Sequence, residues 1–268
     1  MPNNLDVSIV VYGHTESSIA DVINSLCDSV KISDIAELNI IIIDNKGDFS
    51  LCTLKSLVGC HYSYSVQLIV RKDNPGYAVA NNLAIKCGDS NYHLILNPDV
   101  LLSINAIDNA MKFFSSHPKC ILLSPKIING ENRVISGIKR YPSVFVLTLR
   151  LLNISFLNEL FHQYLSNYAC IDIIESDKPS KVLIASGCCM LFNKEALKSI
   201  NGFSEEYFLY FEDFDLSIKA GLHGEIYYFP SFEIRHFGGN TGRKGLKHIK
   251  YFIASMVKFF YKHGLKIY

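Results

Sequence analysis

Apolar runs alternate with helical spacings through the first half of the chain. Four runs rich in aliphatic and β-branched residues predict strands over residues 7–12, 38–43, 66–70 and 94–96. Apolar positions that recur every three or four residues predict helices that end near Leu26, Val58, Cys87 and Ser115. Strands that alternate with helices pair in parallel through right-handed crossovers. The pattern therefore predicts an α/β fold with a doubly wound, mainly parallel sheet.

The second half of the chain has a less regular pattern. Asn129-Gly130 between aliphatic stretches predicts a hairpin over residues 127–135. Residues 145–165 have the spacing of one or two amphipathic helices. Residues 181–192 form another apolar strand region, which is interrupted at Ser186-Gly187, where the backbone can approach a ligand closely.

The end of the chain predicts one more strand and one more helix. Residues 226–229 predict the strand, and residues 234–239 predict a loop after it. From Leu246 onward, four apolar residues recur at helical spacing, namely Ile249, Ile253, Met256 and Phe260, and lysines stand between them. Such a basic amphipathic helix either lies in the plane of a membrane surface or packs on the domain with its lysines in water.

Composition sets broad limits on the function. The chain has 268 residues, of which 49% are hydrophobic and 19% charged, and its net charge is +1. The mean hydropathy of +0.18 indicates an apolar surface. The longest apolar run, Val144–Leu149, is followed by Arg150 and is too short to span a bilayer. We expect no nucleic-acid partner.

The cysteines and the glycines exclude some classes of site. Eight cysteines show no CxxC pair and no regular spacing. Since no secretory signal precedes the first strand, we expect them to be reduced core residues of a cytoplasmic protein. The sequence has neither a Walker-type P-loop motif nor GxGxxG after the first strand, which argues against the common phosphate-binding loops.

The most informative stretch runs from Leu94 to Val100, where an aliphatic run stops at Asn97, Pro98 and Asp99. Pro98 has no N–H to donate to a sheet, so the strand ends here and Asp99 is displayed at its carboxyl end. Ligands of open α/β sheets bind outside these ends, so Asp99 is a candidate for holding a divalent metal and, through it, a phosphate. The alternative is an ordinary turn, for which Asn, Pro and Asp are common residues.

A second candidate group consists of Glu212, Asp213 and Asp215, at the start of a predicted helix, where the helix dipole favours carboxylates. Glu212 and Asp215 share a helix face, whereas Asp213 is rotated by about 100° from Glu212. The three acids therefore cannot all have the same role, and we expect one to point into a cleft. The aromatic residues around them are more often core than a binding platform. Downstream, His236 is either a metal ligand or an ordinary hydrogen-bonded residue.

Taken in order, these motifs resemble the inverting GT-A glycosyltransferases of glycosyltransferase family 2. Within that family the chain is most similar to the bacterial rhamnosyltransferases that build O-antigen and related surface polysaccharides. The resemblance covers about residues 5–265 and rests on an ordered set of motifs: Ile43-Asp44-Asn45, Asn74 to Asn82, Leu96 to Val100, Ser186-Gly187, Gly202-Phe203, Glu212 to Leu216 and His236.

The resemblance implies a role for each residue of a donor-binding part, at about residues 1–125. Asp44 would contact the nucleotide base. Three further residues would line the nucleoside pocket, namely Asn74, Gly76 and Asn82.

The resemblance also implies how the chemistry is divided. Asn97 and Asp99 would lie beside the donor. Asn97 would stand in place of the first acid of the family's DxD motif, and Asp99 would correspond to its last acid. Asp99 and His236 would hold a divalent metal, Mg²⁺ or Mn²⁺, which neutralises a diphosphate leaving group. Asp213 would be the catalytic base that accepts the proton of the attacking hydroxyl, as the base of an inverting glycosidase does with water.

The implied organisation is one glycosyltransferase domain over residues 1–242, with an acceptor and catalytic part at about 126–242, followed by a basic helix over 243–268. The implied donor is dTDP-L-rhamnose, and the implied acceptor is a lipid-linked saccharide of O-antigen and lipopolysaccharide biosynthesis. The implied location is cytoplasmic, peripheral at the inner face of the cytoplasmic membrane. Because Asn97 replaces an acid, the alternative is a non-catalytic glycosyltransferase-like protein that binds a nucleotide sugar or a partner.

Overall fold

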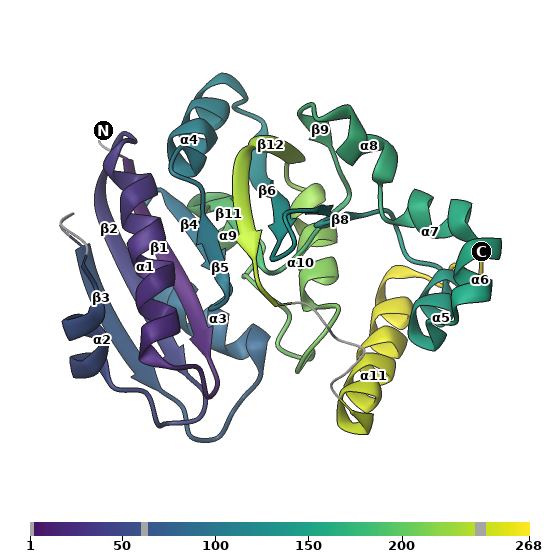
Figure 1. Ribbon diagram of the computed structural model, residues 1–268, viewed down its shortest axis with the longest axis horizontal. Helices are drawn as coiled ribbons and strands as arrows, with labels where there is room; N and C mark the ends of the chain where they lie inside the picture. The colour runs from purple at the N-terminus through teal and green to yellow at the C-terminus, as the bar shows by residue number, and fades with distance from the viewer. Residues whose placement is uncertain (1–2, 60–63, 239–244) are drawn as a thin grey trace.

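A computed structural model describes residues 3–59, 64–238 and 245–268, which form a central sheet covered by helices (Figure 1). The elements of the first half are β1 (Asn3–Val11), α1 (Glu16–Lys31), β2 (Ile35–Asp44), α2 (Leu51–Leu57), β3 (Tyr64–Val70), α3 (Tyr77–Cys87), β4 (Tyr92–Leu96), β5 (Val100–Leu102) and α4 (Ala106–Ser116).

The elements of the second half are β6 (Cys120–Asn129), β7 (Val134–Ile135), β8 (Ile138–Lys139), α5 (Val144–Leu152), α6 (Ser155–Leu160), α7 (His162–Tyr168), α8 (Ile171–Ser176), β9 (Ser180–Lys181), β10 (Ile184–Ala185), β11 (Cys189–Asn193), α9 (Lys194–Ser199), α10 (Glu212–Gly221), β12 (Glu225–His236) and α11 (Leu246–His263).

The sheet has the strand order β3-β2-β1-β4-β11-β6-β12-β5, with β7 beside β6 and β9 beside β12. The pairs among β3, β2, β1 and β4 are all parallel. In the second half, β11 runs antiparallel to both β4 and β6, and β12 is parallel to β6 but antiparallel to β5. The prediction of an α/β fold with a mainly parallel central sheet is confirmed.

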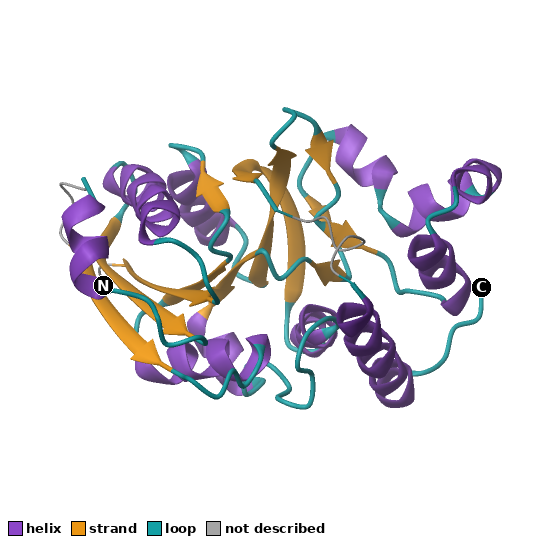
Figure 2. Cartoon of the chain, turned by 60° about the horizontal axis from the view of Figure 1, so that its bottom comes forward, coloured by secondary structure: helices purple, strands orange, loops and turns teal. Residues whose placement is uncertain are grey.

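Both faces of the central strands are buried. In β2, Ile40 and Ile42 pack into the cluster that contains α1 and α4, whereas Ile41 and Ile43 pack with residues of α3. Successive residues of a strand point to opposite faces, so an unbroken isoleucine run fits only a sheet that is covered on both faces. Figure 2 shows helices on both sides of the strands.

The strand that starts the Asn-Pro-Asp stretch ends as predicted, because β4 stops at Leu96; a further short strand, β5, begins at Val100. One predicted element is divided differently in the structure. Residues 145–165 contain three short helices rather than one or two, since Asn153 adopts a left-handed φ of 48° and ends α5. The predicted hairpin is confirmed, with Ile127 opposite Ile135.

Strand β12 is longer than predicted. Ile234 to His236, which the sequence assigned to a loop, pair with β6 on one side and with β5 on the other. The loop prediction was wrong for these three residues, because the pairing partners lie more than a hundred residues earlier in the chain. Gly239, the last residue of that predicted loop, lies outside the described residues.

The C-terminal helix α11 is amphipathic as predicted, but its apolar residues divide between the domain and the solvent. Met256 and Phe260 pack in a cluster with Phe259 and residues of α5. By contrast, Ile249 and Ile253 are 39% and 42% exposed. Within the described ranges, no helix is both long and apolar enough to cross a bilayer.

The cysteines do not all match the expectation of reduced core residues. Cys27 is disulfide-bonded, and Cys52 and Cys87 are exposed. The expectation holds for four free and buried cysteines, namely Cys120, Cys170, Cys188 and Cys189. Cys60 lies outside the described residues.

Candidate active site

The loop after β4 is tied to two other parts of the fold. The backbone N–H of Asn97 donates to Cys188 O at 2.8 Å, so the loop adjoins the segment that precedes β11. The hydroxyl of Tyr77, at the start of α3, lies 3.0 Å from Asn97 Oδ1 and 2.8 Å from Gly187 O. The Asn-Pro-Asp stretch and Ser186-Gly187, which the sequence singled out separately, are therefore parts of one site.

Asp99 and His236 come together as predicted, although by an unpredicted route. The antiparallel pairing of β12 with β5 places His236 opposite Val100, the residue after Asp99. The imidazole Nε2 lies 3.2 Å from Asp99 Oδ1 without hydrogen-bond geometry, and among the described residues this buried oxygen has no hydrogen bond. Burial raises the pKa of Asp99, but His236, the backbone and His14 together lower it, so the net pKa is below its ordinary value.

A carboxylate oxygen and an imidazole nitrogen that face each other without a hydrogen bond fit a shared divalent cation. The described residues contain no cluster of three or more His, Cys, Asp or Glu side chains around one such point. A cation held by Asp99 and His236 would take its other ligands from the donor diphosphate and water, as Mg²⁺ commonly does. Gly238 keeps the site open, because a Cβ there would collide with Asp99 Oδ2.

Asp44 ends β2, and its carboxylate holds the following loop. Oδ1 accepts hydrogen bonds from the N–H groups of Lys46 and Gly47, and Oδ2 accepts one from Phe49 N, each at 2.9 Å. Burial alone raises the pKa of Asp44, but the backbone donors together lower it by more. The net pKa is therefore below its ordinary value, and the carboxylate is ionised. Its predicted contact with a nucleotide base stays a prediction.

The Asn74-Pro75-Gly76 turn leads into α3 through strained backbone. Asn74 and Gly76 have positive φ angles of 43° and 95°. A Cβ at Gly76 would lie 2.6 Å from Phe208 O, which also accepts the N–H of Tyr77 at 3.1 Å. The turn is therefore fixed against the loop that precedes α10.

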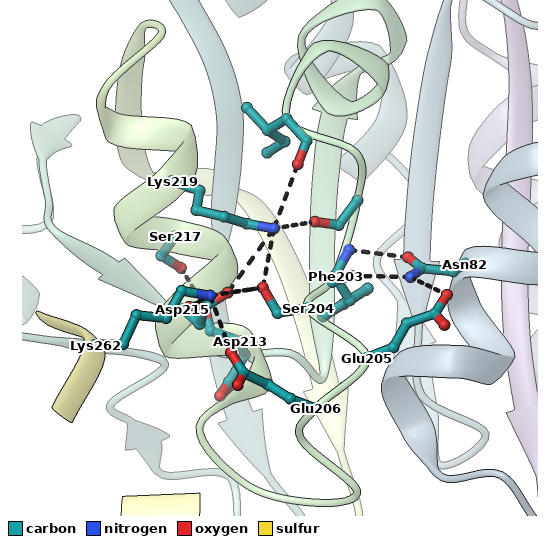
Figure 3. Close-up of polar contacts among 12 residues, drawn as sticks. Asn82, Phe203, Ser204, Glu205, Glu206, Asp213, Asp215, Ser217, Lys219 and Lys262 are labelled. Atoms are coloured by element: carbon teal, nitrogen blue, oxygen red, sulfur yellow. Dashed lines mark hydrogen bonds and ion pairs between the residues drawn. The ribbon is translucent and has the colours of Figure 1, made fainter. Parts of the chain in front are cut away.

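Asn82 joins α3 to that same loop. Its amide nitrogen donates to Phe203 O and to Glu205 Oε1, each at 2.9 Å, and its oxygen accepts the N–H of Phe203 at 2.9 Å (Figure 3). The amide is thus occupied inside the protein, and Asn82 positions the loop. Its predicted place in the nucleoside pocket stays a prediction.

The three acids of the cluster have three different environments. The half-buried Asp213 accepts the N–H of Gly187 through Oδ2 at 2.9 Å and that of Phe214 through Oδ1 at 3.0 Å. Burial raises the pKa of Asp213 above its ordinary value, against the effect of these donors. Glu212 is buried, and its Oε2 has no hydrogen bond among the described residues. Burial, together with the charge of Asp213, raises the pKa of Glu212 well above the ordinary value. Of the two, Asp213 carries the charge, because only its carboxylate has backbone donors on both oxygens.

Asp215 is an anchor for α11. Its Oδ1 lies 2.8 Å from Lys262 Nζ, and its Oδ2 accepts the hydroxyl of Ser204 at 2.6 Å (Figure 3). Oδ1 also lies 2.8 Å from His263 Nε2. Both oxygens of this fully buried carboxylate are thereby occupied. The prediction that the three acids have different roles agrees with this geometry. The acid that faces Gly187 is Asp213.

Three more side chains belong to this region, although the sequence analysis gave them no role. Burial, and after it the charges of Asp99 and Asp213, raise the pKa of the Cys188 thiol to about 12, and the carbonyl of Cys188 accepts the N–H of Asn97. Burial and the charge of Arg150 lower the pKa of Lys139 to about 7, and Asp213 partly opposes them. His14, after β1, interacts with Asp99, although burial lowers its pKa. Only His14 had a signal in the sequence, a histidine directly after a strand.

Comparison with known proteins identifies the family. The sequence profile described as "Glycosyl transferase family 2" matches residues 6–200, more than half of the chain. The "N-acetylglucosaminyl-diphospho-decaprenol L-rhamnosyltransferase" of Mycobacterium tuberculosis (strain H37Rv) is 28% identical over 198 residues, which cover 69% of this chain and 63% of that relative. This chain therefore spans less than two thirds of the mycobacterial relative. "Rhamnosyltransferase WbbL" of Escherichia coli (strain K12) is 24% identical over 249 residues, 88% of this chain and 84% of the relative.

Solved structures share the fold. TarS of S. aureus matches with a TM-score of 0.58 and 15% identity, over 96% of this chain and 40% of that chain. GalNAc-T7, solved with UDP, GalNAc and Mn²⁺, matches with a TM-score of 0.65 and 15% identity, over 91% of this chain and 45% of that chain. The GT-A expectation is thereby confirmed. This chain belongs to glycosyl transferase family 2, and within that family its sequence is similar to rhamnosyltransferases.

Proposed function

We propose that the protein is an inverting glycosyltransferase that moves L-rhamnose from dTDP-L-rhamnose to a lipid-linked saccharide in the synthesis of O-antigen or a related surface polysaccharide. The names of the two curated relatives support the sugar, and the name of the mycobacterial one supports a lipid-diphosphate-linked acceptor. The observation that carries the proposal is that Asp213 and the loop of Asp99 meet on the Gly187-Cys188 segment, where Gly187 N donates to Asp213 and Asn97 N donates to Cys188 O.

On the donor side, Asp99 and His236 would hold the divalent cation, which supplies neutralisation of the diphosphate charge as the sugar departs. Asn97 is held in place by Tyr77, so its amide can orient the donor without adding a negative charge. Asp44 ends β2, and Asn74 and Gly76 lie between β3 and α3, which supports a donor site at the carboxyl edge of the sheet.

On the acceptor side, Asp213 accepts the proton of the attacking hydroxyl. The N–H groups of Gly187 and Phe214 fix the orientation of its carboxylate, and burial raises its pKa, which makes it a stronger base than an exposed aspartate. A base and a leaving group on opposite faces of the sugar give inversion, as they do in inverting glycosidases.

The experiment is a donor and acceptor screen with the purified full chain. The protein is incubated with Mg²⁺ or Mn²⁺, with dTDP-L-rhamnose, UDP-sugars or GDP-sugars, and with a short-chain polyprenyl-diphosphate N-acetylglucosamine. We expect transfer from dTDP-L-rhamnose and inversion at the anomeric carbon by NMR. Transfer from a different donor would reject the sugar assignment. Binding of a nucleotide sugar with neither transfer nor hydrolysis would favour the non-catalytic alternative.

A further inference from the structure

The helices between β8 and β9 expose an unusual set of apolar side chains. Between residues 151 and 164, six large hydrophobic residues are between 45% and 70% exposed, namely Leu151, Leu152, Ile154, Phe156, Leu160 and Tyr164. Helix α6 has no buried residue at all, although half of its residues are apolar. Single exposed hydrophobic residues are common, but a run of them on adjacent helices marks a binding surface.

The C-terminal segment extends this surface. Val144 N donates to Lys266 O at 2.8 Å and Phe145 N to Ile267 O at 3.1 Å, so residues 264–268 lie along the start of α5. Three apolar side chains of this segment are 55% to 79% exposed, namely Leu265, Ile267 and Tyr268. Figure 1 shows α5, α6, α11 and the C-terminus together at one end of the molecule, opposite the end that holds α2.

The charged residues around this surface are mainly positive. Residues 245–268 contain five lysines and no aspartate or glutamate, and residues 144–171 contain a single acid, Glu159. Lys262 pairs with Asp215 and Glu206, and Lys258 donates to Glu206 O. Lys250 and Lys266 are exposed and have no ion pair among the described residues. Exposed apolar side chains in a lysine-rich, acid-poor part of the chain are complementary to an anionic lipid surface.

We infer that α5–α7 and the C-terminal segment 264–268 form a docking face for an anionic bilayer. A second copy of the chain is a poorer occupant, because a twofold contact would bring two lysine-rich, acid-poor surfaces together. The docking face differs from the stripe on α11 that the sequence indicated, because Met256 and Phe260 of that stripe are packed against the domain.

The docking face is connected to the active site through α11. Lys262 and His263, at the end of that helix, hold Asp215, which lies two residues after Asp213. Engagement of the face with a bilayer would therefore orient the proposed base toward a lipid-linked acceptor. The orientation of the base toward an acceptor rests on the proposed function, whereas the binding of the docking face to lipid does not.

Flotation of the full-length protein with vesicles tests the inference. Phosphatidylcholine vesicles with and without phosphatidylglycerol are compared. We expect the protein to float with the anionic vesicles and much less with the neutral ones. Two double variants, Phe156→Glu with Leu160→Glu and Lys250→Glu with Lys266→Glu, should each reduce the bound fraction at least tenfold. Their matched controls, Leu57→Glu on α2 and Lys31→Glu on α1, should bind as the unmodified protein does.

The outcomes separate the two proposals. If the unmodified protein ignores anionic vesicles, or if both double variants bind like their controls while melting normally, the docking face is wrong. A dimer in sedimentation velocity that both double variants dissociate would assign the surface to a second copy and also overturn the inference. Normal vesicle binding without sugar transfer from any donor would leave the docking face standing and reject the proposed function.

Discussion

The backbone N–H of Gly187 donates to Asp213 Oδ2 at 2.9 Å, and the carbonyl of the same glycine lies 2.8 Å from the hydroxyl of Tyr77. Because that hydroxyl also contacts Asn97, the backbone of a single residue, Gly187, links the proposed base to the loop that carries Asp99. Donor-side and acceptor-side groups are thereby held in one rigid arrangement, in which small displacements matter.

Gly187→Ala should slow transfer without preventing donor binding. An added Cβ would lie 3.1 Å from Asp213 Cβ, which forces a shift of a few tenths of an ångström. Since a misplacement of 1 Å can cost about 100-fold, we expect a loss of roughly tenfold in kcat with a nearly unchanged donor Kd. Gly59→Ala is the control, because its Cβ would meet nothing within 4 Å. Equal rates for the two variants would show that the position of Asp213 is not critical.

The rate of transfer should fall as the pH decreases. A base works only when it is ionised, and burial raises the pKa of Asp213 above the ordinary value of 3.8. The acidic limb of the kcat/KM profile should therefore have its midpoint above pH 3.8, with full activity on the alkaline side. Stability is recorded at each pH by intrinsic fluorescence. An acidic limb that coincides with unfolding, or a rate that rises on acidification, would contradict this role.

Asp215→Asn should destabilise the protein, because Lys262 and His263 lose their shared partner. Hydrogen bonds to charged groups contribute about 1.5 to 3 kcal/mol, and we expect a loss in that range at pH 7 from denaturant unfolding. Asp172→Asn, which removes the exposed pair with Arg140, should cost about 0 to 1 kcal/mol. A similar effect of the two substitutions would mean that Asp215 does not anchor α11.

The effect of Asp215→Asn should also depend on pH. Burial raises the pKa of Asp215, but Lys262, Ser204 and His263 together lower it below the ordinary 3.8. A group with a lowered pKa in the folded state stabilises the protein above its unfolded pKa and loses that contribution as the pH falls through the folded pKa. The difference from the unmodified protein should be full at pH 7 and shrink below about pH 3.8. A difference that stays constant down to pH 2.5 would refute this linkage.

Asp99→Asn should remove the metal dependence of donor binding. Calorimetry with dTDP should show tighter binding in Mg²⁺ or Mn²⁺ than in chelator, by about 10- to 100-fold, because Asp99 would hold a cation that neutralises the diphosphate. In the variant the ratio should approach one. Asp108→Asn on α4, which removes only a surface pair with Lys112, should leave the ratio unchanged. Equal affinity with and without metal in the unmodified protein rejects Asp99 and His236 as ligands.

The sequence predicted well those features that depend on neighbouring residues. The isoleucine run of β2 and the stop at Pro98 each follow from local chemistry, and both are confirmed as a buried strand and a strand end. The predicted loop at Ile234 to His236 failed, because its strand character comes from pairing with β5 and β6. The division into residues 1–242 and 243–268 stays a prediction, since its boundary lies outside the described residues.

Within the site, residue types were easier to predict than partners. The helical period indicated that Asp213 and Asp215 have different roles, but two partners of Asp215, Lys262 and His263, are on α11, and His263 is 48 residues away. Tyr77 and Lys139 gave no signal, because a tyrosine at a helix start and a lysine on a short strand are ordinary residues. The contact of Tyr77 with Gly187 and the position of Lys139 over the ring of Tyr168 both join residues that lie close only in the folded chain.

The most direct test of the account is the transfer rate of Asp213→Asn, which keeps the shape of the side chain but loses the proton acceptor. General-base catalysis contributes about 10²- to 10⁴-fold, so transfer should fall by that factor while donor affinity and melting temperature stay near those of the unmodified protein. Glu212→Gln and Asp215→Asn are measured beside it at neutral pH. If Asp213→Asn retains most of the transfer rate while one of the other two abolishes it without unfolding, Asp213 is not the base.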